Sequence, residues 1–418
     1  MGETEVSSTV DILFQDWINL ILRWAHLITG IAWIGSSFYF VWLDLSLRKR
    51  PDMDEGVYGE AWMVHGGGFY HVNKWMVAPS SMPPELHWFK YEAYFTWITG
   101  FALLVTMYYW SAESYLIDPS VLALTKMDAI LIGLGSLFAG WVIYDIICKS
   151  PIGKSTGKLA VALFILIMAA AYLFTHVFSG RGAFIHVGAM IGTIMAANVF
   201  RIIIPNQKKV VASLMAGEKP DPALGLQAKQ RSTHNNYLTL PVVFPMLSNH
   251  YPLAFATEHA WIIAALIFLT GVTIRHYFNT LHRTGAGPHW TWAVTVLIMV
   301  LIAWLSTFSG TGSLEAAEAR ALSPQDRRHV EAPGFEDAYL AVIGNCSMCH
   351  ARTPAWEGIW QAAKAVYLET EADVARHATQ IYLQAGLSRA MPPPNAFPMP
   401  DEARAAITAW IRGVRGES

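Results

Sequence analysis

Long apolar stretches separated by short polar segments run along the first three quarters of the chain. Seven of them reach the roughly 20 residues that an α-helix needs to cross the hydrocarbon layer of a bilayer. They lie near residues 17–43, 92–111, 127–147, 158–178, 183–203, 256–277 and 289–309. The pattern therefore predicts a polytopic helical membrane protein.

A shorter apolar stretch, from Tyr237 to Tyr251, carries Pro241 and Pro245. A proline kink is tolerated in a membrane helix when neighbouring groups re-satisfy the backbone carbonyl that loses its partner. We therefore count this stretch as an eighth span. The expected fold class is all-α: a polytopic bundle of about eight transmembrane helices, followed by a small helical domain described below.

The placement of Lys and Arg predicts the orientation of this bundle. With eight spans, the segments 44–91, 148–157, 204–236 and 278–288 share one side, and these segments with their helix ends are rich in Lys and Arg. The opposite turns hold only Lys126 and Arg181. By the positive-inside rule the basic side is cytoplasmic. Both termini then face the periplasm of a bacterial inner membrane. Without the eighth span, the last two spans and the C-terminal domain would be inverted, and the distribution of Lys and Arg would contradict the positive-inside rule.

Composition agrees with a membrane protein and limits the choice of partners. Of the 418 residues, 54% are hydrophobic and 14% are charged, against about a quarter charged in soluble domains. The net charge of −2 gives no reason to expect a nucleic-acid partner, and membrane lipid is the expected surrounding. The acidic N-terminus lacks the basic region of a secretory signal, so we expect the first span to remain uncleaved.

The C-terminal quarter contains one strong chemical motif. Residues 311–334 are predicted to be a linker, and after them Phe335–Asn345 and Asp401–Arg412 have the pattern of a small soluble helical domain over 335–418, behind a membrane domain over 1–310. The sequence Cys346-Ser347-Met348-Cys349-His350 lies in this domain. C-x-x-C-H is typical of covalent c-type haem attachment, with the histidine as iron ligand.

Two alternatives for this motif are a redox C-x-x-C pair and half of a zinc site. No thioredoxin-like βαβ pattern surrounds it, and no second cysteine pair follows it, since the third cysteine, Cys148, lies alone at the end of an apolar stretch. Haem c is therefore the predicted cofactor, and residues 335–418 are expected to form a small class I cytochrome c domain. Resemblance to the cytochromes c implies an extracytoplasmic site of attachment, which agrees with the orientation inferred from the charges.

A sixth iron ligand is expected late in the domain. Ala390-Met391-Pro392-Pro393 resembles the Met-Pro loop of class I cytochromes c, so Met391 is the predicted ligand, and Met399 in Phe397-Pro398-Met399-Pro400 is the second choice. A methionine that binds no metal is the ordinary case for either residue alone. A thioether ligand raises the haem potential, which would suit acceptance of electrons.

Ionisable side chains within membrane spans are costly and therefore mark candidate functional sites. His176, His186, His250 and His259 flank two outer turns and are expected at similar depth, and His26 could face the same layer. Imidazoles at matched depth could ligate a haem b, relay protons or bind substrate. The ordinary interpretation of each one alone is an interfacial histidine bonded to a carbonyl. Glu258, next to His259, and Asn249, next to His250, could hydrogen-bond to these histidines.

The first cytoplasmic loop contains His65-Gly66-Gly67-Gly68-Phe69-Tyr70-His71, with Trp62 before it and Trp75 after it. Aromatic side chains that can stack on a flat ring alternate here with polar ones, and the triple glycine allows close approach of the backbone. His65 and His71 are therefore candidate catalytic residues, together with His26. An amphipathic interfacial helix is the alternative for this loop.

Several segments together resemble the bacterial membrane-bound urate oxidases, the PuuD-type urate hydroxylases. They are the segment from Arg23 to Tyr39, which contains His26, the loop from His65 to Trp75, Ser232-Thr233-His234-Asn235-Asn236-Tyr237 and Leu247-Ser248-Asn249-His250-Tyr251. The resemblance spans the chain. It implies oxidation of urate to 5-hydroxyisourate, the first step of urate breakdown in purine catabolism. It also implies that electrons pass to cytochrome c and a terminal oxidase of the respiratory chain rather than directly to oxygen.

Two other functions are open at this point. A quinol to cytochrome c oxidoreductase would need no urate chemistry, and its outer histidines could hold haem b. A purine transporter with an attached redox sensor is the third candidate. The response of haem c to urate and to quinol would separate the three.

Overall fold

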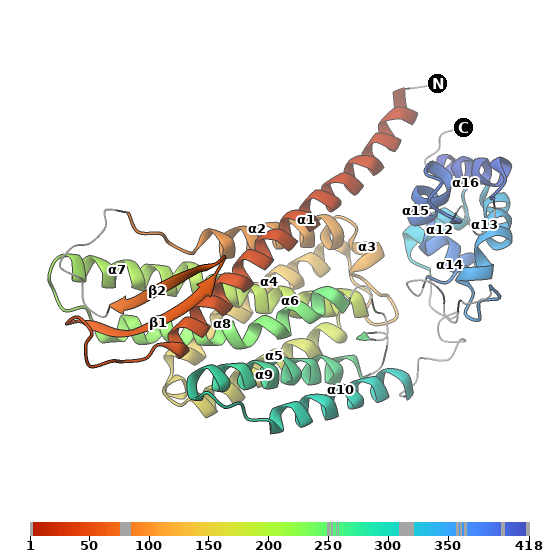
Figure 1. The fold of residues 1–418 in the computed structure, drawn as a ribbon. Coiled ribbons are helices and arrows are strands. Elements are labelled where there is room, and N and C mark those ends of the chain that lie inside the picture. The colour runs from red at the N-terminus through yellow and green to blue at the C-terminus, as the bar shows by residue number, and fades with distance from the viewer. Residues whose placement is uncertain are drawn as a thin grey trace.

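A computed structural model of the chain shows a helical bundle with a smaller group of helices beside one of its ends (Figure 1). It describes residues 3–75, 85–248, 251, 254–255, 257, 259–308, 322–356, 359, 362, 366–393 and 398–414. The fold is all-α apart from one hairpin. The predicted all-α class with a polytopic helix bundle is confirmed, and the assignment of residues 335–418 as a cytochrome c domain stays a prediction.

Six helical segments among the described residues are long and apolar enough to cross a membrane. They lie in α1 (Glu3–Ser46), α4 (Lys126–Lys149), α5 (Thr156–Thr175), the continuous helix of α6 (Gly180–Ala197), η3 (Asn198–Ile203) and α7 (Ile204–Met215), α9 (Ala260–Thr284) and α10 (Trp290–Phe308). All six coincide with predicted spans. The protein is therefore a polytopic membrane protein.

The other two predicted spans are also helical, but they differ from simple apolar spans. The first is α2 (Tyr91–Leu104), which continues through η1 (Val105–Tyr109). The second is α8 (Pro222–Ser248), which begins well before Tyr237 and remains helical through both of its prolines. Glycines of the neighbouring helices face these prolines: Gly271 of α9 lies against Pro241, and Gly188 of α6 lies against Pro245.

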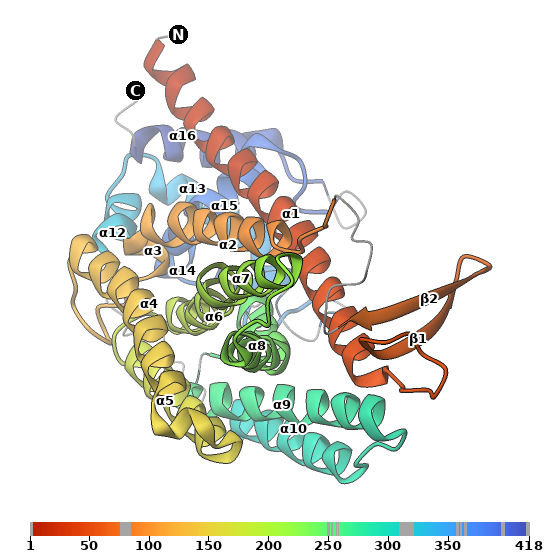
Figure 2. The same ribbon diagram turned by 90° about the vertical axis from the view of Figure 1, so that its left-hand side faces the viewer.

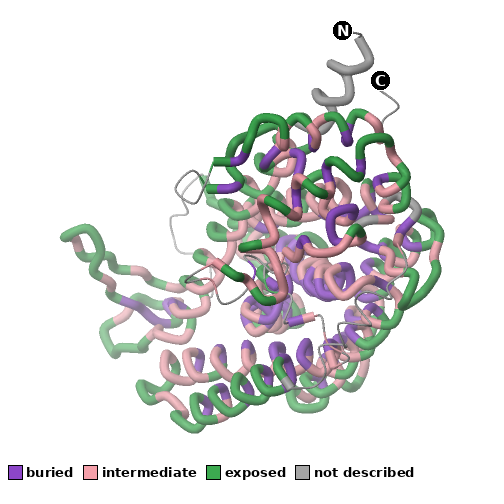
Figure 3. The backbone as a smooth tube through the Cα atoms, turned by 90° about the vertical axis from the view of Figure 1, so that its right-hand side faces the viewer, coloured by how far each residue is buried: buried purple, intermediate pink, exposed green. Residues whose placement is uncertain are grey.

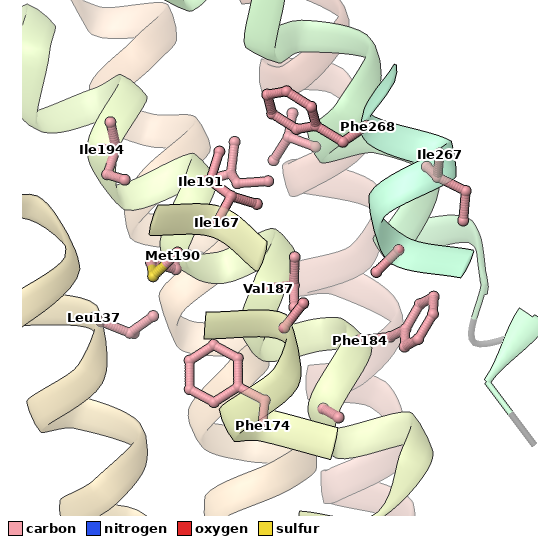
Figure 4. Packing of buried hydrophobic residues seen from close by; sticks show 14 of the residues in the cluster. Leu137, Ile167, Phe174, Phe184, Val187, Met190, Ile191, Ile194, Ile267 and Phe268 are labelled. Atoms are coloured by element: carbon pink, nitrogen blue, oxygen red, sulfur yellow. The ribbon is translucent and has the colours of Figure 1, made fainter. Parts of the chain in front are cut away.

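The core of the bundle lies where α4, α5, α6 and α9 meet. Phe174, Val187, Met190 and Ile267 belong to this core, and Figure 4 shows their side chains directed into the shared interior. Buried residues are concentrated in the middle of the bundle, whereas the outer helices are largely exposed (Figure 3). The apolar side chains exposed on α1 include Trp17, Leu20, Ile21, Trp24, Leu27 and Ile31. Exposed apolar side chains on such a scale are expected where helices face lipid.

The first predicted cytoplasmic loop forms a β-hairpin, so the interfacial-helix alternative is wrong. β1 (Val57–His65) pairs antiparallel with β2 (Gly68–Trp75), and His65 lies opposite Gly68. Gly66 and Gly67 make the two-residue turn with φ values of 58° and 79°. Positive φ at both positions is typical of the hairpin turn whose twist matches the strands, so the glycines serve the turn here.

The hairpin and the C-terminal helices lie at opposite ends of the bundle. Figure 1 shows β1, β2 and α7 at one end, and α3 (Ala112–Tyr115) and the C-terminal helices at the other, where both chain termini also lie. Figure 2, seen along the bundle, places α8 near its centre. α8 packs against α6, α7 and α9 and also contacts α1.

The C-terminal residues form their own core. It is built from α13 (Phe335–His350), α14 (Glu371–Arg376), α15 (Ala378–Ile381), η6 (Tyr382–Leu387) and α16 (Asp401–Val414), around the fully buried Trp410. Part of the predicted linker is helical as well: α12 (Pro324–Val330) starts with a capping box at Ser323, and the carbonyl of His329 accepts a 2.8 Å hydrogen bond from Trp410 Nε1. Residues 311–321 of that linker lie outside the described residues.

Candidate functional site

The C-x-x-C-H motif ends helix α13. Cys346 and Cys349 lie one helical turn apart with free thiols, and His350 is the last residue of the helix. His350 Nδ1 lies 2.9 Å from the Val366 carbonyl oxygen, to which it can donate. A histidine whose Nδ1 is held in this way presents Nε2 to a metal. The motif therefore fits the attachment of a haem through two thiols and one imidazole.

The environment of the two thiols differs. Burial raises the pKa of Cys346 to about 11 and also raises the pKa of the less buried Cys349 thiol. Both are therefore thiols rather than thiolates at neutral pH. Within the described ranges, no three or more His, Cys, Asp or Glu residues come together as a metal site, so the zinc alternative has no further ligands there.

The two candidate methionines differ in position. Met399 is buried in the C-terminal core and is 5% exposed, whereas Met391 is 37% exposed. The backbone of Met391 is held at both ends, since its N–H donates to the Gln384 carbonyl at 2.9 Å and its carbonyl accepts from Arg404 at 3.1 Å. The choice of Met391 as sixth ligand stays a prediction.

The three candidate catalytic histidines lie on separate elements or faces. His26 packs on α2, where its Nδ1 lies 3.0 Å from the Thr96 carbonyl and 3.2 Å from Thr99 Oγ1. His71 pairs with Glu60 at 2.6 Å and stacks on Trp62 with 4.1 Å between ring centroids, whereas His65 is exposed at the end of β1. The hydrogen bond from His71 lowers the pKa of Glu60. The structure thus does not bring His26 into the same constellation as the hairpin histidines.

The outer histidines do not form a common cluster among the described residues. His186 is fully buried, with Nε2 3.1 Å from the Tyr109 hydroxyl and Nδ1 2.8 Å from the Gly182 carbonyl. His176 is exposed and bonds to the Tyr172 carbonyl, and His259 precedes the first turn of α9. His250, together with Asn249 and Glu258, lies outside the described residues.

This arrangement bears on the second cofactor. Both ring nitrogens of His186 already have partners, so His186 would have to give up Tyr109 to ligate a haem iron. We therefore derive no chemistry from a haem b in this layer, and its presence stays a prediction.

A buried polar network on α8 is the most developed polar site in the membrane part. Arg231 is 3% exposed and pairs with Asp145 of α4 at 2.7 Å. The Tyr144 hydroxyl lies 2.7 Å from His234 Nδ1 and accepts a 2.9 Å hydrogen bond from Asn198. A second Asn198 hydrogen bond, of 3.0 Å, reaches Asn235. Three helical segments that are distant in sequence are therefore joined by polar side chains inside the bundle.

The sequence analysis did not single out these residues as a site. His234, Asn235 and Asn236 carried only the family resemblance, and Arg231 was used only for its charge. Asp145 within the apolar span 127–147 was the available indication, because a carboxylate inside a span requires a buried cation.

A family model described as urate oxidase N-terminal matches residues 12–306, which include most of α1, all of the helices from α2 to α9 and most of α10. The chain belongs to this family. No curated protein and no solved structure matches the chain. The matched range holds the whole α8 network, whereas the C-x-x-C-H motif lies beyond it. Membership relates the membrane part of this chain to urate and to oxidoreductase chemistry.

Proposed function

We propose that this protein is a membrane-bound urate oxidase that converts urate to 5-hydroxyisourate. In the balanced reaction urate and one water give 5-hydroxyisourate, two electrons and two protons. The electrons would pass to a cytochrome c or terminal oxidase of the respiratory chain, so hydrogen peroxide would not be a product, and the C-terminal motif would hold the haem c that accepts them one at a time. The family match over residues 12–306 is the observation that carries this proposal.

The C-terminal motif supports the electron-transfer part of the proposal. Cys346 and Cys349 would hold the haem, His350 would be its proximal ligand, and Met391 its sixth ligand. When bound, haem c supplies a one-electron acceptor whose potential is raised by a thioether ligand. The hydrogen bond between His350 Nδ1 and the Val366 carbonyl would fix the imidazole for this role.

The proposed orientation rests on the charge pattern and agrees with the arrangement of the fold. We place the basic end, with the hairpin and α7, in the cytoplasm, and the C-terminal helices in the periplasm. These two groups of elements lie at opposite ends of the bundle (Figure 1). Contacts at the outer end include a 2.9 Å hydrogen bond from Gln380 to the Tyr115 hydroxyl of α3. Such contacts would keep the C-terminal helices at the outer end of the helices that would bind urate.

The decisive experiment adds urate anaerobically to membranes that contain the oxidised protein, and follows the absorbance bands of reduced haem c. Reduction by urate, with formation of 5-hydroxyisourate, supports the proposal. Reduction by a quinol and not by urate would instead make the protein a quinol to cytochrome c oxidoreductase. Uptake of urate without any spectral change would indicate the transporter.

The relay role of the motif has its own test. Cys349→Ser is expected to abolish covalent haem and urate turnover, while the membrane part remains inserted. Cys148→Ser is the matched control for attachment, because Cys148 is a free cysteine of α4 outside the motif, and it should keep covalent haem. Sustained urate turnover by Cys349→Ser would contradict the relay role.

A further inference from the structure

A second buried arginine of the bundle lacks the partner that the first one has. Arg275 of α9 is 5% exposed, and within the described ranges no carboxylate lies in salt-bridge distance of it. Arg231, which is 3% exposed, is compensated by Asp145. A buried cation without an anionic partner carries a large desolvation penalty. The bundle thus contains an uncompensated positive charge between α1, α8 and α9.

The neighbours of Arg275 fix the direction of its guanidinium. Its Nε donates to Asn236 Oδ1 at 3.4 Å, its NH2 nitrogen donates to Asn279 Oδ1 at 3.1 Å, and Asn279 Nδ2 donates to Asn236 Oδ1 at 2.8 Å. Phe38 of α1 covers the guanidinium, with the Arg275 carbon Cζ 3.8 Å from the ring centroid. The planar cation is therefore held against an aromatic ring by two amide side chains.

This arrangement leaves hydrogen-bond donors unused. Asn236 is fully buried, and its Oδ1 accepts from both Arg275 and Asn279, so its amide nitrogen must face the other way. That nitrogen has no hydrogen-bond partner among the described residues. Burying an amide NH2 without a hydrogen-bond partner costs free energy. Such a group indicates that an acceptor binds there.

One face of α9 contributes a further polar atom. Arg275, Asn279 and His282 are spaced four and three residues apart, which places them on the same face of a helix. His282 Nδ1 is also buried and without a partner among the described residues. Gly271 continues the face and lies against Pro241, so α8 and α9 approach closely beside this group.

We propose that Arg275, Asn236 and His282 form a binding site for a planar anion that is rich in acceptors, and that this anion is the urate monoanion. The inference rests on the proposed function. Urate at neutral pH carries one negative charge, and its carbonyl oxygens and ring nitrogens lie in one plane. The guanidinium supplies the charge, the Asn236 amide supplies N–H donors, and the neutral His282 ring can accept from or donate to a ring N–H.

The test measures binding of radiolabelled urate to the full-length holoprotein, reduced beforehand so that urate cannot be oxidised. Arg275→Gln is expected to weaken urate binding by about tenfold to a hundredfold, the range for loss of a hydrogen bond to a charged group. Arg283→Gln is the matched control, because Arg283 lies on the same helix and is exposed. It should change the affinity less than about twofold. Hypoxanthine, a neutral purine, should compete weakly with all forms.

A second variant separates loss of binding from loss of fold. Asn236→Asp keeps the oxygen that accepts from Arg275 and Asn279, but it replaces the free amide by a carboxylate that neutralises Arg275, as Asp145 neutralises Arg231. It should bind urate at least about a hundredfold more weakly while remaining folded.

Wild-type affinity in a folded Arg275→Gln or in Asn236→Asp would overturn the site, even if the wild type oxidises urate. Absence of both binding and oxidation of urate in the wild type would overturn the site and the proposed function together.

Discussion

Tyr144 Oη and His234 Nδ1 lie 2.7 Å apart, and a third residue shares the same hydroxyl. Asn198 Nδ2 donates to the same hydroxyl at 2.9 Å. The Tyr144 hydroxyl thus joins His234 of α8 to Asn198 of η3 inside the bundle.

Replacing Tyr144 by Phe tests this relationship. The change leaves His234 Nδ1 and one Asn198 N–H without their partner in a buried place, so it should lower the free energy of unfolding by about 1–3 kcal/mol. The measurement is thermal unfolding of the purified protein in detergent. Tyr172→Phe is the control, because Tyr172 is 51% exposed on α5. Equal transition temperatures for the two variants would contradict the structural role of the network.

The contact between Tyr109 and His186 depends on a glycine of α4. A Cβ at Gly133 would lie 2.6 Å from the Tyr109 hydroxyl and 2.8 Å from His186 Nε2, whereas a Cβ at Gly135 of the same helix would meet nothing within 4 Å. Gly133→Ala should therefore separate the pair and destabilise the protein by about 1–3 kcal/mol, the usual cost of overpacking. Gly135→Ala should be neutral or stabilising. Thermal unfolding of both variants checks this. An unchanged transition temperature for Gly133→Ala would show that Tyr109 and His186 can shift without loss of stability.

The sequence predicted the scaffold better than the site, for a physical reason. Lipid requires long apolar helices, so local composition is enough to predict the spans of α1, α4, α5, α6, α9 and α10. The hairpin was missed because its aromatic and glycine residues suit both an interface and a β-turn.

The site was missed because its residues are joined only by tertiary contacts. Asn198, His234 and Asp145 lie on three helices, and no spacing along the chain relates them. Arg275 served only as one of the basic residues that predict the orientation. Its position within the predicted span 256–277 already marked it as a buried charge in need of a partner.

The Glu60–His71 pair predicts a dependence of the hairpin on pH. His71 donates to Glu60 at 2.6 Å and lowers the pKa of that carboxyl. A carboxylate with a lowered pKa stabilises the folded form fully above its ordinary pKa, and this contribution is lost as the pH falls through the lowered value. Hydrogen exchange of the amides of β1 and β2 should therefore speed up, beyond the intrinsic effect of pH, as the solution is acidified through that range.

Glu60→Gln is the variant that checks the cause of this effect. It should show faster exchange at neutral pH and no additional opening of the hairpin on acidification. Asp44→Asn is the control, since Asp44 pairs with Lys74 of β2 at 2.6 Å and this pair involves no histidine. Retention of the acid-induced opening in Glu60→Gln would assign it to another group.

The last prediction separates the two candidate methionine ligands of the C-terminal domain. Met391→Leu should remove the spectroscopic signature of thioether ligation and lower the reduction potential of the haem, because a methionine ligand raises that potential. Met399→Leu should keep both properties and change the free energy of unfolding by less than about 1.5 kcal/mol, because it conserves volume in a core where Met399 is 5% exposed. Spectroelectrochemical titration of the two holoproteins measures the difference. If instead the potential falls in Met399→Leu alone, the buried methionine of the Phe397-Pro398-Met399-Pro400 segment is the ligand, and residues 391–393 only form the wall of the site.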